Sequence, residues 1–307
     1  MDPNETLSGL PAWQKALLQR YRLDPAYLAS AQYWFDPLAD SLAVHQTGAT
    51  RPVLIGVNGS QGSGKSTLCA YLEMAIAAKY QLKAVTLSLD DFYLPHADRL
   101  LLSQDSHPLF ATRGVPGTHD MALLKTTLDA LLDEGRGSPV PVPRFDKATD
   151  DRSHQPEWVP CPVDIVLLEG WCLGVHPQTA DELIEPMNVL ERTEDPDVAW
   201  RTRVNDILRR DFLPLYQRVD QWIMLQAPSF DCVFKWRLEQ EKKLGRAHAV
   251  KLGKRVMNED QLARFIQFFE RLTRQGLEQM PSRMNHLFTL DEARQVKAYQ
   301  QRDEWLE

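Results

Sequence analysis

The sequence has few cysteines, and none of them is placed as a metal ligand or a redox pair would be. The four cysteines, Cys69, Cys161, Cys172 and Cys232, are scattered over 307 residues without a C-x-x-C pair, which excludes a zinc ribbon or a thioredoxin-like motif. The eight histidines show no H-E-x-x-H spacing, so a zinc enzyme has no support. We therefore expect reduced thiols with structural roles.

A long apolar segment and an excess of positive charge are also missing. No apolar run approaches the roughly 20 residues that span a bilayer, and residues 1–5 lack the apolar core of a signal peptide. Acidic residues outnumber basic residues by 42 to 35, and the formal net charge of −7 argues against a general nucleic-acid-binding surface. These absences favour a cytoplasmic protein with neither a membrane nor a nucleic-acid partner.

The most informative feature that is present is a phosphate-binding loop. Residues 59–66 read GSQGSGKS and match G-x-x-x-x-G-K-[ST] without a mismatch. The apolar run at 53–57 predicts a buried parallel strand before the loop, and apolar residues at helical spacing follow it from Leu68 to Ile76. Strand, loop and helix thus occur in the order that nucleotide binding needs.

The glycines of this loop allow the chain to turn so that successive N–H groups converge on one anion. The helix that begins near Lys65 adds its unpaired N–H groups and the positive end of its dipole. We expect Lys65 to reach the β- and γ-phosphates of ATP, and the Ser66 hydroxyl to bind Mg²⁺. The predicted nucleotide contacts are Gly59, Ser60, Gln61, Gly62, Ser63, Gly64, Lys65, Ser66 and Thr67.

Strand and helix signals alternate from residue 51 onward, as in βαβ units around a parallel sheet. Beyond the first strand, the pattern predicts strands at 84–89, 163–168, 221–225 and 286–290. We therefore predict an α/β fold of the P-loop NTPase type, with three layers (helices, sheet, helices) and a mostly parallel central sheet.

The remaining segments define the predicted domain organisation. Residues 1–48 carry two helical patterns and are expected to form a helical N-terminal extension, either packed on the main domain or used as a dimerisation arm. Residues 49–307 form the predicted P-loop domain, in which the arginine-rich segment at about 195–217 is expected to be an inserted helical lid. A basic stretch at 242–255 matches no motif, and we interpret it as a solvated helix end.

Acidic residues follow two of the predicted strands, at the edge where open α/β sheets bind their ligands. Asp90 ends the second strand, where a carboxylate can accept the proton of a substrate hydroxyl and orient it for in-line attack. Glu169 follows the third strand and would face Mg²⁺ as a Walker-B acid does. Asp91 is either an outer member of the metal site or the cap of the next turn. Because no N-K-x-D or L-S-G-G-Q motif occurs, these carboxylates favour a small-molecule kinase over a GTPase or a transporter.

The order of the P-loop, SLDDFY at 88–93 and LEGW at 168–171 resembles the group of uridine kinase, pantothenate kinase and phosphoribulokinase. Further runs look most like the P-loop D-glycerate 3-kinases. They are DDFYL at 90–94, RGVPGTHD at 113–120, VPRFDK at 142–147, EGWCLG at 169–174 and WRL at 236–238. The similarity spans roughly residues 51–291, and the motifs keep their order.

This resemblance implies a role for individual residues. Asp90 would be the general base, and Lys65 and Arg237 would stabilise the transferred phosphate. Ser66 and Glu169, with Asp90 beside them, would form the magnesium site. The implied acceptor contacts are Asp91, Tyr93, Arg113, His119, Asp120, Arg144 and Lys147. A guanidinium suits the carboxylate of glycerate, and Arg113, Arg144 and Arg152 all stay open as the residue that binds it.

The predicted reaction is transfer of the γ-phosphoryl group of ATP to a hydroxyl of D-glycerate, giving 3-phosphoglycerate, with ATP and Mg²⁺ as cofactors. One alternative is a kinase of another small alcohol, such as uridine or a pantothenate-like acid. A nucleoside would need aromatic stacking within 92–120, where the aromatic residues are Phe92, Tyr93 and Phe110. Another alternative is a non-catalytic ATP-binding switch, which would not need Asp90. The sequence leaves the oligomeric state open.

Overall fold

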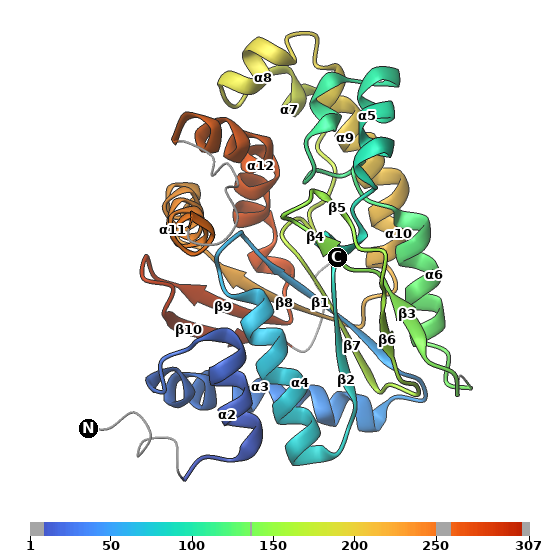
Figure 1. Cartoon of the computed structure of the whole chain (residues 1–307), viewed down its shortest axis with the longest axis vertical. Helices are drawn as coiled ribbons and strands as arrows, with labels where there is room; N and C mark the ends of the chain where they lie inside the picture. The colour runs from blue at the N-terminus through green and yellow to red at the C-terminus, as the bar shows by residue number, and fades with distance from the viewer. Residues whose placement is uncertain (1–8, 136, 250–258, 303–307) are drawn as a thin grey trace.

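A computed structural model describes residues 9–135, 137–249 and 259–302 of the chain (Figure 1). The side chains of the basic stretch 242–255 lie outside the described residues. None of the described helices has both the length and the apolar character that crossing a bilayer requires.

The centre of the molecule is a six-stranded sheet with the order β10-β9-β8-β1-β7-β2. Its strands are β1 (Val53–Gly59), β2 (Ala84–Ser88), β7 (Ile165–Gly170), β8 (Gln221–Gln226), β9 (His286–Leu290) and β10 (Val296–Gln301). Strands β1, β2, β7, β8 and β9 are parallel to one another, and they confirm all five predicted strands. Strand β10 pairs antiparallel with β9 and was not predicted, because most of its side chains are exposed at the sheet edge.

The central strands are buried on both faces, so their alternate side chains enter two separate cores. In β1, Val53 and Ile55 belong to one core, whereas Leu54 belongs to the other. In β7, Leu167 and Leu168 divide in the same way. This explains why both segments read as continuous apolar runs and not as alternating patterns.

Helices cover both faces and complete the three predicted layers (Figure 1). On one face lie α2 (Ala12–Tyr21), α3 (Ala26–Gly48), α4 (Lys65–Tyr80) and α11 (Phe230–Ala249). On the other lie α6 (Met121–Leu131), α9 (Ala199–Ile207) and α10 (Leu213–Tyr216). Helix α12 (Glu259–Gln279) contributes side chains to both cores.

The N-terminal extension is helical as predicted, and its apolar stripe faces inward. Leu17 on α2 and Leu38 and Leu42 on α3 are fully buried. The Tyr71 hydroxyl of α4 donates a 2.5 Å hydrogen bond to Asp36 of α3. The extension therefore packs on the P-loop domain.

Shorter elements connect the main helices and strands. Their helical members are the 3₁₀ turns at Leu89–Phe92, Pro108–Ala111 and Pro281–Arg283, α5 (His96–Asp105), α7 (Ala180–Ile184) and α8 (Val189–Glu194). Two small antiparallel pairs join β3 (Val140–Val142) to β6 (Glu157–Val159), and β4 (Phe145–Asp146) to β5 (Asp151–Arg152). These pairs were not predicted, because strands of two or three residues give too short a pattern to recognise.

The segment predicted as a lid is helical, with a π-helical turn at Leu208–Phe212 between α9 and α10. Its apolar side chains, including Trp200 and Phe212, are buried in the core beneath the sheet. Arg203, Arg209 and Arg210 are exposed. The predicted helical character is thus confirmed, whereas the movement of this segment over the phosphates stays a prediction.

Candidate active site

The P-loop connects β1 to α4 and takes a conformation that requires its glycines. Gly62 and Gly64 have φ angles of +81° and +97°, in the left-handed region that other residues rarely adopt. A Cβ atom on Gly62 would also lie 3.0 Å from Cβ of Trp236 on α11, and one on Gly59 would lie 2.6 Å from the Ser63 hydroxyl. A side chain at either position would therefore distort the loop.

Several polar groups of this loop could contact a bound anion. Lys65 Nζ donates a 3.2 Å hydrogen bond to the Ser60 carbonyl. Among the residues that the structure describes, the buried hydroxyls of Ser60 and Ser63 have no hydrogen-bond partner. Because buried polar atoms are normally satisfied, these hydroxyls fit a loop whose bound phosphates would complete their hydrogen bonding.

Glu169 reaches the loop from the end of β7, which runs parallel to β1. Its carboxylate accepts a 2.9 Å hydrogen bond from the Ser66 hydroxyl, and its second oxygen lies 3.8 Å from Lys65 Nζ. One hydroxyl and one nearly buried carboxylate in contact fit the needs of Mg²⁺, which takes few protein ligands and keeps waters and phosphate oxygens around it. The residues present therefore suit a magnesium ion.

Asp90 stands on the 3₁₀ turn that follows β2, and β2 is paired with β7 so that Ser88 lies beside Glu169. Its two carboxylate oxygens have different partners. The Tyr93 hydroxyl donates to Oδ1 at 2.9 Å, and Lys147 Nζ donates to Oδ2 at 2.6 Å. Removal from water tends to raise the pKa of Asp90, but Lys147 and Tyr93 together outweigh this and hold it well below its ordinary value. Asp90 is thus a charged acceptor near neutral pH.

Asp91 and Arg144 connect the 3₁₀ turn that follows β2 to the β4 and β6 segments. Arg144 Nη1 donates a 2.6 Å hydrogen bond to Asp91, and Arg144 Nε and Nη2 both donate to Glu157, at 2.9 and 2.6 Å. The other Asp91 oxygen accepts from the backbone N–H of Phe145 at 3.0 Å. Asp91 therefore anchors the β4–β5 pair, and the guanidinium of Arg144 is occupied by two carboxylates.

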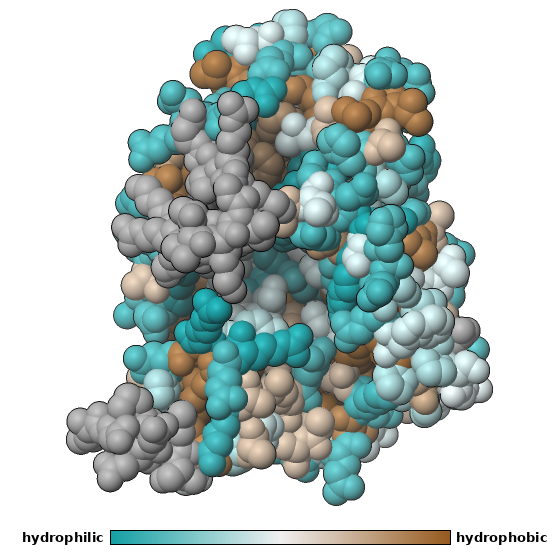
Figure 2. All heavy atoms as spheres, in the orientation of Figure 1, coloured by the Kyte–Doolittle hydropathy of each residue, from teal (hydrophilic) through white to brown (hydrophobic). Residues whose placement is uncertain are grey.

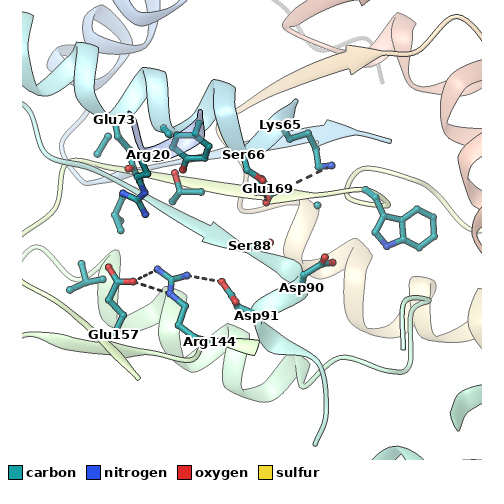
Figure 3. Close-up of a pocket in the computed structure, with 18 of the residues that line it drawn as sticks. Arg20, Lys65, Ser66, Glu73, Ser88, Asp90, Asp91, Arg144, Glu157 and Glu169 are labelled. Carbon is teal, nitrogen blue, oxygen red and sulfur yellow. Dashed lines mark hydrogen bonds and ion pairs between the residues drawn. The ribbon is translucent and has the colours of Figure 1, made fainter. Parts of the chain in front are cut away.

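These groups line one cavity of about 570 Å³ between α4 and β2 on one side and β6 on the other (Figure 3). In Figure 2 the molecule is hollowed near its centre, and hydrophilic side chains surround the hollow. The predicted site residues that line the cavity are Gln61, Gly62, Lys65, Ser66, Asp90, Asp91, Arg144, Lys147, Glu169 and Arg237. Residues as distant in the sequence as Gln61 and Arg237 thus line one cavity, and their roles there stay predictions.

Several lining residues were missed by the sequence interpretation. Arg20 and Tyr21 come from α2, Glu73 from α4, and Trp158 from β6. None belongs to a recognisable motif, and only the packing of α2 against α4 brings the first two to the cavity. Trp171, two residues after Glu169, also lines it, and its place in the LEGW run at 168–171 was a signal that could have found it.

Two of the predicted acceptor contacts form a stack behind the cavity wall. The rings of Tyr93 and His119 stack with centroids 4.6 Å apart. His119 is 5% exposed, and its two ring nitrogens have no partner among the described residues. Burial lowers the pKa of His119 to about 4, so its ring is neutral. Tyr93 reaches the site through its hydroxyl on Asp90, and direct contact of either ring with the acceptor stays a prediction.

Two further predicted contacts are engaged elsewhere. Arg113 forms an ion pair with Asp150 and lies 5.5 Å above the Phe145 ring. Asp120 is the N-cap of α6, and its side chain accepts a 3.0 Å hydrogen bond from the N–H of Leu123. Neither residue lines the cavity, and their role in acceptor binding stays a prediction.

Among the described residues, α11 contributes an arginine to the cavity, whereas the segment predicted as a lid contributes none. Arg237 lines the cavity and lies 5.7 Å from the centroid of Phe265. By contrast, Arg209 and Arg210 form ion pairs with Asp206 and Asp211, and neither they nor Arg203 line the cavity.

A second group of possible metal ligands, His107, Asp195 and Asp197, lies at the start of α9. Asp195 accepts hydrogen bonds from the backbone N–H groups of Trp200 and Arg201, at 2.8 and 3.2 Å. The carboxylate is therefore explained by capping of the helix.

Comparison with known proteins places the chain among kinases. It is 32% identical over 230 residues to an uncharacterized kinase of Schizosaccharomyces pombe, covering 71% of this chain and 79% of that protein. It is 29% identical over 242 residues to the chloroplastic D-glycerate 3-kinase of Arabidopsis thaliana, covering 74% of this chain and 48% of that protein. No protein-family model matches the sequence.

A solved structure agrees with these relatives. The D-glycerate 3-kinase of Cryptococcus neoformans var. grubii superposes with a TM-score of 0.71 at 26% identity. The superposition covers 86% of this chain and 96% of that one. The likeness therefore extends over both layers of helices as well as the sheet.

Proposed function

Because this chain belongs to the family of P-loop kinases that includes the D-glycerate 3-kinases, we propose that it transfers the γ-phosphoryl group of ATP to a hydroxyl of D-glycerate, giving 3-phosphoglycerate. The observation that carries this proposal is the position of Asp90. Its carboxylate shares one cavity with Lys65 and Ser66 of the P-loop and is paired with a lysine that suits an acidic acceptor.

In the proposed reaction, Asp90 accepts the proton of the acceptor hydroxyl as the oxygen attacks the γ-phosphorus and the bond to the β–γ bridging oxygen breaks. Orientation is the larger contribution, since well-aligned reactants can lower a barrier by roughly 7–11 kcal/mol. Lys65 and Arg237 face the transferred group from two elements, where they would stabilise its negative charge.

Ser66 and Glu169 would hold Mg²⁺, since their oxygens lie 2.9 Å apart beside the P-loop. A bound magnesium ion neutralises charge on the β- and γ-phosphates of ATP. Asp90, which was also predicted at the metal, makes its described side-chain contacts with Tyr93 and Lys147, and its place among the metal ligands stays a prediction.

A nucleoside acceptor would have to stack on aromatic residues other than those predicted for it. The three aromatic residues predicted to be available for base stacking, Phe92, Tyr93 and Phe110, are at most 3% exposed and do not line the cavity. A short acid, by contrast, needs only a cation near Asp90, and Lys147 supplies one.

A coupled assay of ADP release with Mg·ATP tests the proposal, with D-glycerate, L-glycerate, uridine and pantothenate as acceptors. We expect ADP release that depends on D-glycerate, with 3-phosphoglycerate identified as the product. Release with uridine or pantothenate alone would keep the kinase mechanism and overturn the acceptor. ATP binding without release in the presence of any of the four would contradict the proposed function.

A further inference from the structure

The cations near the acceptor side of the cavity differ in how far their nitrogen atoms are already hydrogen-bonded. Arg144, an obvious partner for a carboxylate, donates from Nε, Nη1 and Nη2 to Glu157 and Asp91. Two carboxylates already share the charge of this guanidinium, so it attracts a third carboxylate less strongly than a cation with one carboxylate partner does. Arg144 is therefore a structural residue of the site.

The other two arginines proposed from the sequence are also engaged. Arg113 is paired with Asp150. Arg152 donates to the Tyr93 carbonyl at 3.0 Å and to Asp120 at 3.2 Å. Neither arginine lines the cavity. The guanidinium groups of these arginines thus make structural contacts around the cavity.

The remaining lining cations belong to other parts of the cavity. Lys65 and Arg237 belong to the phosphate side, at the P-loop and at α11. Lys83 donates to the Pro160 carbonyl at the edge of β2. Figure 3 places Arg20 beside Glu73, at the end of the cavity opposite Asp90.

Lys147 differs from all of these. It stands in the tight connection between β4 and β5, and its side chain is 59% exposed. Among the described residues its hydrogen bond is the 2.6 Å contact with Asp90. An ammonium group has three donors, so two can still be directed into the cavity.

We infer that Lys147 binds the carboxylate of the acceptor and so restricts the substrates to short hydroxy acids, an inference that rests on the proposed function. The ammonium group and the Asp90 carboxylate are 2.6 Å apart. An acceptor whose carboxylate binds the ammonium group and whose hydroxyl binds the Asp90 carboxylate must carry these two groups a few ångströms apart. A three-carbon hydroxy acid has this spacing, since its carbon–carbon bonds are about 1.5 Å long.

The test compares D-glycerate with its neutral amide, which keeps both hydroxyls and lacks the negative charge. Lys147→Met removes the charge at similar length, and Lys147→Arg restores it. Lys297→Met on β10, where the lysine is 63% exposed, is the matched control for loss of a surface charge. Assays are run above pH 7, so that Asp90 is charged in every variant.

We expect Lys147→Met to lower kcat/KM for D-glycerate by about 10- to 100-fold, the effect of losing a hydrogen bond between charged groups. The change for the amide should be several-fold smaller, so the preference for the acid over the amide falls, and Lys147→Arg should restore part of it. An equal loss with both acceptors would overturn the inference, because Lys147 would then act only through Asp90. A wild-type enzyme without activity on D-glycerate would instead overturn the proposed function itself.

Discussion

The phenolic hydroxyl of Tyr93 donates a 2.9 Å hydrogen bond to Oδ1 of Asp90, three residues earlier in the chain. The ring that carries this hydroxyl is 3% exposed and stacked on His119. A buried, stacked ring leaves the hydroxyl little freedom to move. Tyr93 is thus placed to fix one oxygen of the carboxylate that is proposed to receive the acceptor proton.

Tyr93→Phe should move the acid side of the pH–rate profile. The hydrogen bond favours the charged form of Asp90, so its loss raises the pKa of a carboxyl that must be ionised to accept a proton. We expect the acid limb of kcat/KM to shift to higher pH and kcat at neutral pH to fall by about 10-fold. The measurement is the pH dependence of ADP release. An unchanged acid limb with an unchanged rate would show that Tyr93 does not act on Asp90.

Asp90→Asn should separate transfer from nucleotide binding. The amide cannot take up the proton, so acceptor-dependent ADP release should fall by about 10²- to 10⁴-fold. ATP affinity, measured by calorimetry, should stay within a few-fold of wild type, because the P-loop is untouched. Asp98→Asn, an exposed position on α5, is the matched control. Near-normal turnover in Asp90→Asn would remove the general base from the mechanism.

Glu169→Gln should weaken the dependence on magnesium. The carboxylate contacts both Ser66 and Lys65, and the neutral amide would hold Mg²⁺ less tightly. We expect the Mg²⁺ concentration for half-maximal activity to rise by about 10-fold or more. A magnesium titration at saturating ATP measures this, with the 75% exposed Glu292→Gln as control. An unchanged titration would place the metal on other residues.

The stability of the fold should decrease in mild acid because of His119. Its pKa is about 4 in the folded chain and 6.5 ordinarily, so between these values the unfolded state binds the additional proton. The free energy of unfolding should therefore fall by up to about 3 kcal/mol as the pH drops from 6.5 to 4. Chemical denaturation at several pH values would measure it.

His119→Phe should remove this part of the pH dependence while keeping an aromatic ring against Tyr93. His154→Gln, at an exposed position, should leave it in place. Parallel curves for wild type and His119→Phe would show that the pKa of His119 is the same in the folded and the unfolded chain.

The parts of the site that the sequence predicted are those carried by short-range pattern. The P-loop, Asp90 and Glu169 each follow a continuous apolar strand, and parallel strands bring their carboxyl ends to one edge. The helices before residue 49 were predictable because their apolar residues recur at helical spacing.

The parts that were missed depend on contacts between distant segments. Nothing in the local sequence indicates that Arg113 pairs with Asp150, 37 residues later, or that Arg144 is shared between Asp91 and Glu157. The side-chain partners of these arginines therefore could not be predicted from the motifs that contain them, and their contact with the acceptor stays a prediction. The edge strand β10 was not predicted because its exposed side chains give no apolar pattern.

The packing of α2 and α3 shows that the boundary predicted near residue 48 does not separate two independent structural units. Their leucines share a core with β1 and α4, and α2 lends Arg20 and Tyr21 to the cavity wall. A truncation at this border would expose apolar side chains of the core and remove part of the wall of the cavity in which phosphoryl transfer is proposed to take place. The N-terminal helices and the nucleotide loop therefore depend on one another for both the core and the cavity.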